Sequence, residues 1–534
     1  MKKTILAGAS VLALSIAGPA FAQNQSDIDQ NGNNNSAAAT QSGSDNESII
    51  DQDSIGASAD VTQDGVDNFS SVDQDDVNPQ TGSIGEPGDP DATVSQVGRR
   101  NQSFVTQNIA ENAGFNQTVT VDQSGNDNIS NIDQDSRGPG YSGGFKAEVT
   151  QTGTADSTIN QTGSNTGNQF QNGGNNLRAF VNQDDSTSTI IQRATETSSS
   201  NPAAFASVTQ SGGSDSSVQQ TLTGDLTGDL SATVSQSNGA TSNVLQIAGG
   251  DSSMTMDAIV TQDGASTSTI NQRFEQDFSN TFSATVTQTG NGNSSDINQI
   301  DESPASEQFP DFGLTATVTQ TGRSNISTVD QQNKNLTATV MQLGRSNNSA
   351  VTQRAAGNEA DIWQDGDANH SGITQDGLNN FADVDQTGDD ADSTIVQSGR
   401  DDKAFVAQMG GSNGSQSRIT QIGDLANNDP SPSFSTASVT QSARDNFAKI
   451  DQAGFSNNAT VNQSGRDNRS LNEQIGTLLD SNNTIDVTQS GRSNLSNILQ
   501  DGFGNEAVVT QAGNSDISII NQLGDGNSAT VTQN

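Results

Sequence analysis

Glutamine recurs at a fixed interval of eleven residues over long stretches of this chain, and no other feature limits the fold as strongly. From Gln320 the glutamines follow at positions 331, 342, 353, 364, 375, 386, 397 and 408. A second run falls at 489, 500, 511, 522 and 533, and an early run at 30, 41, 52, 63 and 74. A register kept over so many copies indicates a repeat architecture in which each copy forms the same structural unit.

Each copy of the repeat follows the pattern Q-x-G-x-x-N-x-[AS]-x-[VI]-x-Q. In residues 342–353, Gly344 follows the first glutamine by two positions, and Asn347, Ser349 and Val351 precede the second glutamine at intervals of two. Side chains two positions apart share one face of a β-strand, so the spacing predicts a strand, and the glycine marks a tight turn. A helix is excluded because the period is two and Val, Ile, Thr, Asn and Gly are poor helix formers.

A single strand of this kind cannot bury its apolar face, whereas stacked copies can. Two strands per coil give a repeat of 22 residues, with two parallel sheets facing each other across a thin core and successive coils ~4.8 Å apart. The sequence therefore predicts an all-β fold, a two-sheet parallel β-solenoid of about twenty 22-residue coils. The repeat overrides the composition, because 29% hydrophobic residues and 53 glycines would by themselves predict a disordered chain.

The inward amides are predicted to form ladders along the solenoid. Stacked Gln and Asn residues can hydrogen-bond the amides of the coils above and below, which satisfies buried polar groups and fixes the register. In the most regular stretch the predicted ladder residues are Gln320, Gln331, Gln342, Gln353, Gln364, Gln375, Gln386, Gln397, Asn325, Asn347, Asn358, Asn369 and Asn380, and the predicted turn residues are Gly322, Gly344, Gly366, Gly377 and Gly388.

The spacing of the glutamines also predicts which edge of the coil carries insertions. When the glutamines are paired, for example as Gln183/Gln192 and Gln210/Gln219, the steps within pairs stay between 9 and 13 residues. The steps between pairs lengthen to as many as 22 residues. Every proline after residue 22 falls between pairs, as expected if proline is kept out of the ladders. All long insertions are therefore predicted to lie at one edge.

The N-terminus has the features of a secretory signal peptide, with Lys2 and Lys3 before an apolar stretch and Ala20–Phe21–Ala22 at its end. We predict that residues 1–22 are removed and that residues 23–534 form one exported repeat domain. No later stretch is long and apolar enough to span a bilayer. Loss of the two lysines takes the formal charge from −42 to −44, which argues against binding to nucleic acid.

The repeat resembles the curlin repeats of curli subunits, which build extracellular amyloid fibres (fimbriae or pili) on bacteria. Gln364, Gly366, Asn369, Ser371 and Gln375 carry the resemblance, with Ser in place of the usual Ala. It implies a secreted structural protein that self-assembles into curli-like fibres for cell adhesion and biofilm matrix. It also implies two kinds of partner, further copies of the chain and the curli-type outer-membrane export and nucleation machinery. The chain is much longer than typical curli subunits, so a long monomeric surface β-solenoid adhesin is the alternative.

The sequence offers no residues in a pattern typical of catalysis or of a cofactor site. The chain has no cysteine and one histidine, His370, at an outward slot, so nucleophilic triads and zinc sites are not expected. Aspartates such as Asp73 and Asp385 recur before glutamine and are interpreted as a solvated face rather than as paired catalytic carboxylates. We predict a protein that is not an enzyme, has no cofactor or specific metal site, and attracts divalent cations diffusely.

A less favoured hypothesis is that the solenoid binds ice. Outward threonine pairs such as Thr317/Thr319 could present a flat array to a crystal lattice. The equivalent slots nearby hold Met341 and Trp363, which interrupt such an array.

The two ends of the repeat predict a route to assembly. The repeat pattern begins near Gln30 and runs to Asn534 in a full strand unit. The first and last coils are therefore expected to expose unpaired backbone groups, with which a second copy could pair.

Overall fold

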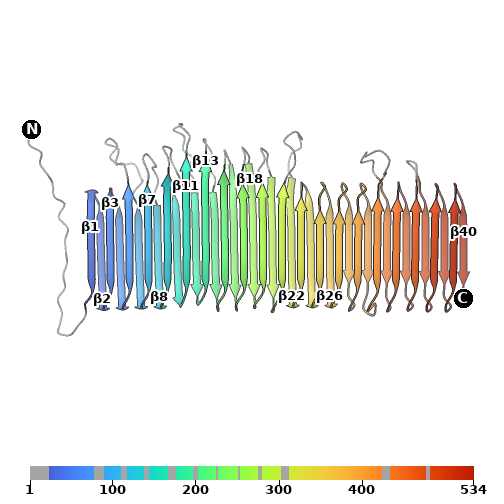
Figure 1. Ribbon diagram of the computed structural model, residues 1–534, viewed down its shortest axis with the longest axis horizontal. Helices are drawn as coiled ribbons and strands as arrows, with labels where there is room; N and C mark the ends of the chain where they lie inside the picture. The colour runs from blue at the N-terminus through green and yellow to red at the C-terminus, as the bar shows by residue number, and fades with distance from the viewer. Residues whose placement is uncertain are drawn as a thin grey trace, which may run out of the picture. The chain divides into compact units, whose positions relative to one another are not determined.

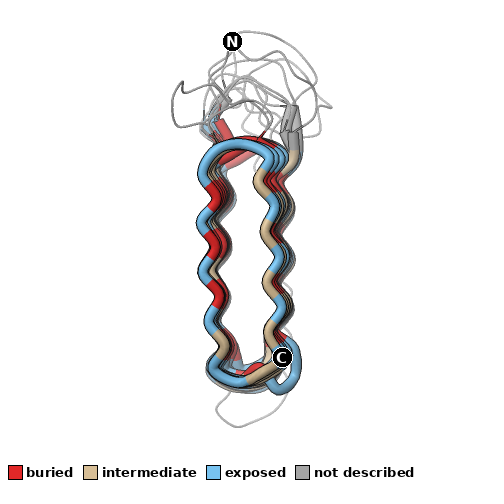
Figure 2. The backbone as a smooth tube through the Cα atoms, turned by 90° about the vertical axis from the view of Figure 1, so that its right-hand side faces the viewer, coloured by how far each residue is buried: buried red, intermediate tan, exposed pale blue. Residues whose placement is uncertain are grey.

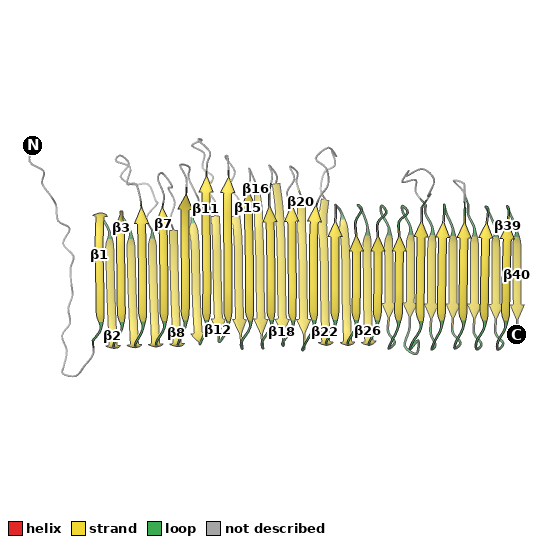
Figure 3. Cartoon of the chain, in the orientation of Figure 1, coloured by secondary structure: helices red, strands yellow, loops and turns green. Residues whose placement is uncertain are grey.

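The computed structural model describes residues 23–76, 90–109, 117–137, 144–165, 176–196, 203–223, 227–249, 253–274, 280–301, 312–423, 433–476 and 481–534. Within these ranges the chain forms strands joined by turns and contains no helix (Figure 3). The strands fall into two compact units, one within residues 1–237 and 246–254 and the other within residues 238–245 and 255–534. The division passes through β17 (Thr241–Ala248) and β18 (Ser253–Asp263).

In the first unit the strands alternate along the chain between two parallel sheets (Figure 1). Each strand pairs with the strand two positions further on, so β1 pairs with β3 and β2 with β4. The odd sheet contains β1 (Gln25–Asn33), β3 (Glu47–Ile55), β5 (Phe69–Asp76), β7 (Gln102–Ile109), β9 (Ile129–Arg137), β11 (Asp156–Asn165), β13 (Thr187–Glu196) and β15 (Asp215–Thr223). The even sheet contains β2 (Ser36–Ser44), β4 (Ser58–Val66), β6 (Asp91–Arg99), β8 (Gln117–Asn126), β10 (Phe145–Gly153), β12 (Asn176–Asp184), β14 (Ala203–Ser211) and β16 (Thr227–Ser237).

The second unit repeats this arrangement, with parallel pairing between strands two positions apart. Its odd sheet contains β19 (Thr267–Phe274), β21 (Ser294–Asp301), β23 (Ile326–Gln332), β25 (Asn348–Gln353), β27 (His370–Gln375), β29 (Asp392–Gln397), β31 (Gln416–Ile422), β33 (Phe447–Ala453), β35 (Arg469–Ile475), β37 (Leu495–Asp501) and β39 (Ile517–Leu523). Its even sheet contains β20 (Asn280–Thr289), β22 (Phe312–Arg323), β24 (Leu336–Arg345), β26 (Glu359–Asp367), β28 (Phe381–Gln386), β30 (Lys403–Gln408), β32 (Thr436–Gln441), β34 (Asn458–Gln463), β36 (Thr484–Gln489), β38 (Glu506–Gln511) and β40 (Ser528–Gln533).

Each unit is therefore a two-sheet parallel β-solenoid, and the predicted fold class is confirmed. Two strands and two turns make one coil, and in the regular stretch each coil adds 22 residues, the separation of Gln342 and Gln364. The grouping of residues 23–534 into one domain stays a prediction. The expected signal peptide lies outside the described residues.

Inward and outward residues alternate along both walls of the coil. In Figure 2, buried and exposed residues alternate along one wall, and intermediate and exposed residues alternate along the other. In β24, Ala338, Val340 and Gln342 are buried, whereas Thr339 and Met341 are exposed. This alternation follows from the pleat of the strand, which sends successive side chains to opposite faces. The thin core consequently consists of stacked rows, most of them made of the same or a similar side chain from one coil to the next.

The two sheets contribute different small residues to the core. Four positions before the buried glutamine, the odd strands mostly carry serine, as at Ser327 and Ser349, and the even strands mostly carry alanine, as at Ala316 and Ala338. The repeat thus has two alternating variants rather than one.

One predicted pair of glutamines is wrong. The structure pairs Gln192 with Gln220, and Gln219 points outward. Val218 is buried, so the residue two positions later shares its inward face. Gln219 and Gln220 are consecutive, so the spacing of the glutamines alone does not identify which of the two points inward.

Every gap in the described residues lies between an odd strand and the next even strand, in agreement with insertions at one edge. Pro90 immediately precedes β6, and its carbonyl accepts a hydrogen bond from Ser58 N. The other prolines after residue 22 lie outside the described residues.

At this insertion edge, several coils replace asparagine with a buried hydrophobic residue. In the first unit Phe145 stacks against Leu177, and in the second unit Phe282 stacks against Leu314, which stacks against Leu336. Leu336, which occupies an asparagine position of the repeat, therefore continues a hydrophobic row. Burial of side chains of this size contributes about 1.5–3 kcal/mol each.

Candidate functional site

Within each unit, a chain of glutamine amides runs along each of the two sheets. Gln320 Nε2 donates to Gln342 Oε1 at 2.7 Å, and Gln342 Nε2 donates to Gln364 Oε1 at 2.8 Å. In the odd sheet Gln331 Nε2 donates to Gln353 Oε1 at 2.9 Å. All the glutamines predicted as ladder residues are 0% exposed, namely Gln320, Gln331, Gln342, Gln353, Gln364, Gln375, Gln386 and Gln397. Each donates in the same direction, toward the coil that follows in the chain.

The same amides also join the two sheets at the corner of the coil. Gln342 Nε2 donates to Ile326 O at 2.9 Å, and Gln353 Nε2 donates to Thr337 O at 3.0 Å. Both carbonyls belong to the sheet opposite the glutamine. Each hydrogen bond contributes roughly 0.5–1.5 kcal/mol net, but a buried amide left without partners would cost more.

The asparagines are buried as well, but they bond mainly to the backbone. Asn347 Nδ2 donates to Leu343 O and Gly366 O, both at 2.8 Å, and Asn347 N donates to Asn325 Oδ1 at 3.1 Å. The expected amide-to-amide ladder is therefore replaced here by bonds that hold the turn. Asparagine side chains are short and readily hydrogen-bond nearby backbone groups, which explains the difference.

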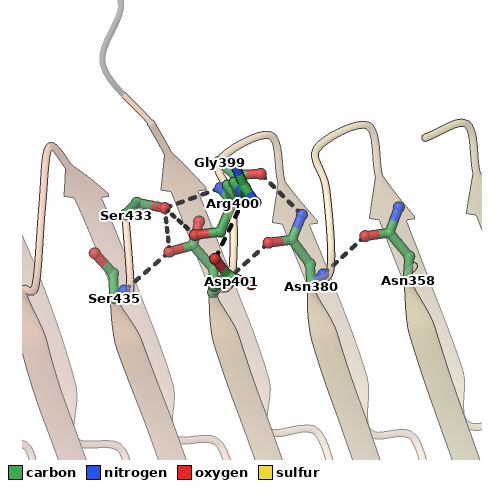
Figure 4. Close-up of polar contacts among 8 residues, drawn as sticks. Asn358, Asn380, Gly399, Arg400, Asp401, Ser433 and Ser435 are labelled. Atoms are coloured by element: carbon green, nitrogen blue, oxygen red, sulfur yellow. Dashed lines mark hydrogen bonds and ion pairs between the residues drawn. The ribbon is translucent and has the colours of Figure 1, made fainter. Parts of the chain in front are cut away.

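The other predicted asparagines lie at equivalent corners. Asn325 and Asn369 are 0% exposed, and Asn358 and Asn380 are 1% exposed. Asn380 N donates to Asn358 Oδ1 at 2.8 Å, and Asn380 Nδ2 donates to Gly399 O at 3.1 Å (Figure 4).

An aspartate takes the asparagine position in the coil that follows Asn380. Asp402 N donates to Asn380 Oδ1 at 3.0 Å, as an asparagine would in its place. Asp402 Oδ1 accepts from Ser433 Oγ at 2.5 Å and from Ser435 N at 2.9 Å, while Oδ2 is buried without a hydrogen-bond partner among the described residues. Burial raises the pKa of Asp402 to about 6, against the lowering effect of these two hydrogen bonds.

The predicted turn glycines serve two different purposes. Gly344 has φ 106°, and a Cβ added there would lie 2.1 Å from Gly366 O in the next coil. Gly377 does not have positive φ, but an added Cβ would lie 1.7 Å from Gly399 O. Gly322 and Gly366 also have positive φ, and an added Cβ at either would lie close to a glycine carbonyl oxygen of the next coil. At Gly388 the nearest atom to an added Cβ is Ser412 Oγ, at 2.7 Å.

A second left-handed residue in the turn was not predicted. The residue just before the buried asparagine has positive φ, as at Ser346 (56°), Ala368 (59°) and Asn379 (54°). Asn and Asp tolerate this conformation better than most residues. The frequent Asp, Asn or Ser before the ladder asparagine is the sequence signal that indicates it.

The acidic turns hold the backbone of the preceding coil. Asp367 Oδ1 accepts from Arg345 N at 2.9 Å, and Asp389 Oδ1 accepts from Asp367 N at 2.9 Å. These contacts account for the aspartates in turns such as residues 365–369. Among the described residues, no cluster of three or more His, Cys, Asp or Glu side chains could hold a metal ion.

The outward faces carry the remaining residues singled out from the sequence. His370 is exposed on β27, beside Asn348 and Asp392. Thr317 pairs in register with Thr339, but Thr319 pairs with Met341.

Acidic rows occur on the first odd strands. Asp51 pairs in register with Asp73, and Asp53 pairs with Asp75. Burial raises the pKa of Asp73, and the charges of Asp51 and Asp75 raise it further. Burial also raises the pKa of Asp75, and the charges of Asp53 and Asp51 raise it further.

The curlin-associated repeat family matches seven segments of the chain, residues 24–53, 334–366, 355–388, 435–465, 443–476, 481–513 and 505–534. These segments carry the curlin-associated repeat. Several coils of this curlin-repeat protein that lie outside the matched segments have Phe or Leu in place of asparagine, as at Phe145 and Leu314. Comparison with curated proteins found no match.

The family and the solenoid fold are typical of extracellular, fibre-forming structural proteins rather than of enzymes. In the described part of the chain, no helix is long and apolar enough to cross a membrane.

Proposed function

We propose that this curlin-repeat protein is secreted and self-assembles end to end into curli-like amyloid fibres that serve cell adhesion and biofilm matrix. Curli-type outer-membrane export and nucleation machinery would deliver it, after removal of residues 1–22. In this role it is a structural protein without enzymatic activity.

The uniform interface between successive coils carries the proposal. Gln342 presents to Gln364 the same donor that Gln364 presents to Gln386, each at 2.8 Å, and the flanking strands pair in the same register. A surface that complements its own repeat can bind another copy head to tail. Head-to-tail interfaces that do not close into a ring build open filaments.

The outermost described strands offer edges for this addition. Among the described residues, β1 and β2 pair with β3 and β4, and β39 and β40 pair with β37 and β38. A second copy could pair with their other edges through backbone bonds and glutamine amides, as in cross-β stacking.

Fibre formation by purified residues 23–534 tests the proposal. After incubation, electron microscopy should show fibres, and diffraction should show a repeat at ~4.8 Å along the fibre axis. A preparation that stays monomeric at high concentration, in acid and with calcium would contradict fibre assembly. The alternative, a monomeric surface adhesin, would then be favoured.

A further inference from the structure

The single tryptophan of the chain lies on the outer face of the even sheet in the second unit. Trp363, on β26, is 48% exposed. In register it lies between Met341 on β24 and Asp385 on β28. Asp361 and Asp365 lie two positions before and after it, so they share its outward face. The indole is thus surrounded by carboxylates on three sides and by a thioether on the fourth.

In the described part of the chain, the carboxylates around the indole have no cationic partner. Among the described residues, none of Glu359, Asp361, Asp365, Asp383 and Asp385 forms an ion pair or accepts a hydrogen bond through its carboxylate. Two basic residues on nearby strands are in register with other residues. Arg345 pairs in register with Asp367 at the turn, and Lys403 pairs with Phe381.

These carboxylates also repel one another. Asp361 and Asp383 occupy facing positions on adjacent strands. Burial raises the pKa of Asp383, and the charges of Asp361 and Asp385 raise it further. Asp385 Oδ1 is buried and has no hydrogen-bond partner among the described residues. A bound cation would relieve the repulsion and supply the missing donors.

We propose that this surface, the Trp363 face (Met341, Glu359, Asp361, Trp363, Asp365, Asp383 and Asp385), binds an extended, arginine-rich segment of another protein. A guanidinium can stack on the indole and can pair with a carboxylate through two parallel hydrogen bonds, whereas an ammonium cannot do the latter. Alternate residues of an extended peptide repeat at roughly 6.8 Å, the same spacing that separates Asp361, Trp363 and Asp365 on their strand. Arginine at every second position would therefore match the row.

Other acidic surfaces of the chain lack a tryptophan. The row Asp29, Asp51 and Asp73 on β1, β3 and β5 also consists of stacked carboxylates, but its neighbouring rows contain no tryptophan. It provides a matched control for the effect of charge alone.

Tryptophan emission tests the proposal directly, because Trp363 is the only tryptophan. The probe is an eleven-residue peptide of alternating Arg and Ser, titrated into the purified full-length mature chain, with the Glu–Ser peptide as the negative control. We expect a saturable change in emission with the arginine peptide alone. The triple variant Asp361→Asn/Asp383→Asn/Asp385→Asn should bind about 10-fold more weakly, as expected for the loss of several exposed ion pairs. The control Asp29→Asn/Asp51→Asn/Asp73→Asn should stay within about two-fold of the parent.

Anisotropy of a fluorescent arginine peptide gives a second measurement that does not require the indole. Trp363→Ala should weaken binding by about 3-fold to 5-fold, in the range of a cation–π contact at an exposed site. Equal weakening by the two triple variants would show binding by bulk charge and overturn the proposal. Unchanged Trp363 emission at saturating arginine peptide would overturn it as well. So would an emission change with a neutral polysaccharide that is equal in the parent and in the Asp361→Asn/Asp383→Asn/Asp385→Asn variant.

Discussion

Gln342 Nε2 lies 2.8 Å from Gln364 Oε1, across one full coil of the solenoid. The same bond follows between Gln364 and Gln386, so the amides form a directed chain rather than isolated pairs. A strand that slipped by two residues would keep the same side chains inward but would move each glutamine away from the amide it bonds. The ladder therefore fixes the register that hydrophobic rows of similar residues would leave weakly specified.

Replacement of Gln342 by leucine should destabilise the second unit strongly. Gln320 Nε2 would lose one of its two acceptors and Gln364 Oε1 its donor, at a cost of about 1–3 kcal/mol for each buried hydrogen-bonding group left unpaired. The urea midpoint can be followed through the emission of Trp363, which lies on the strand next to Gln342. Gln416→Leu makes the same change at an exposed position and should alter the midpoint little. Equal shifts for both variants would refute the inward ladder.

Asp402→Asn should stabilise the protein above about pH 6. An asparagine can donate from the position where Oδ2 now has no hydrogen-bond partner among the described residues, as Asn380 Nδ2 donates to Gly399 O at 3.1 Å. The pKa of Asp402 is raised to about 6 by burial, so the folded state holds the proton more tightly than the unfolded state. Stability is therefore present at low pH and falls as pH rises from about 4 to about 6, by roughly 3 kcal/mol in all.

The measurement is the free energy of unfolding of parent and variant between pH 3.5 and 8, by denaturant titration. The contribution of Asp402 to the slope between about pH 4 and 6 should disappear in Asp402→Asn. Asp390→Asn, which removes an exposed carboxylate just before a ladder position, should retain that slope. The raised pKa of Asp402 would be contradicted if the parent's free energy of unfolding kept rising between about pH 4 and 6 and did not differ from that of Asp402→Asn.

The fold was predictable because its decisive signal is periodic. Intervals of two and eleven positions identify the strands, the inward face and the edge that carries insertions. The exact hydrogen bonds were less accessible to sequence reasoning, because Gln and Asn have the same functional group. The extra methylene lets Gln342 reach the next amide, whereas Asn347 folds back onto Leu343 O. Gln220 could have been identified from Val218, because a residue two positions later must share its face.

Ala368→Gly should stabilise the turn between β26 and β27. Ala368 has φ 59°, a conformation that costs an L-residue about 1–2 kcal/mol and costs glycine almost nothing. The greater freedom of glycine in the unfolded chain offsets part of this gain, so the expected net effect is about 0.5–1 kcal/mol. Ala350→Gly makes the same change at an exposed, extended position in β25 and should destabilise by a similar amount. Thermal unfolding of both variants measures the difference, and destabilisation by Ala368→Gly would contradict the expected strain.

Self-association should accelerate in acid, and the acidic rows on β3 and β5 should be one cause. The pKa values of Asp73 and Asp75 are raised by burial and by neighbouring aspartates, so these groups take up protons at higher pH than an isolated aspartate. As pH falls toward 4, their loss of charge reduces repulsion between copies of a chain whose formal charge is −42. Salt should act in the same direction, because the Debye length falls to ~3 Å at 1 M ionic strength.

The variant Asp51→Asn/Asp53→Asn/Asp73→Asn/Asp75→Asn separates this local effect from the total charge. At pH 7 and low salt it should associate faster than the parent, as measured by light scattering at matched concentration. In 1 M salt the two proteins should associate at similar rates, because screening removes the repulsion that the substitutions remove. Calcium should also speed association of the parent, and should do so less in the variant because fewer carboxylates remain to attract it. If the association rate did not change with acid, salt or calcium, charge on the acidic rows of β3 and β5 would not limit the approach of two copies.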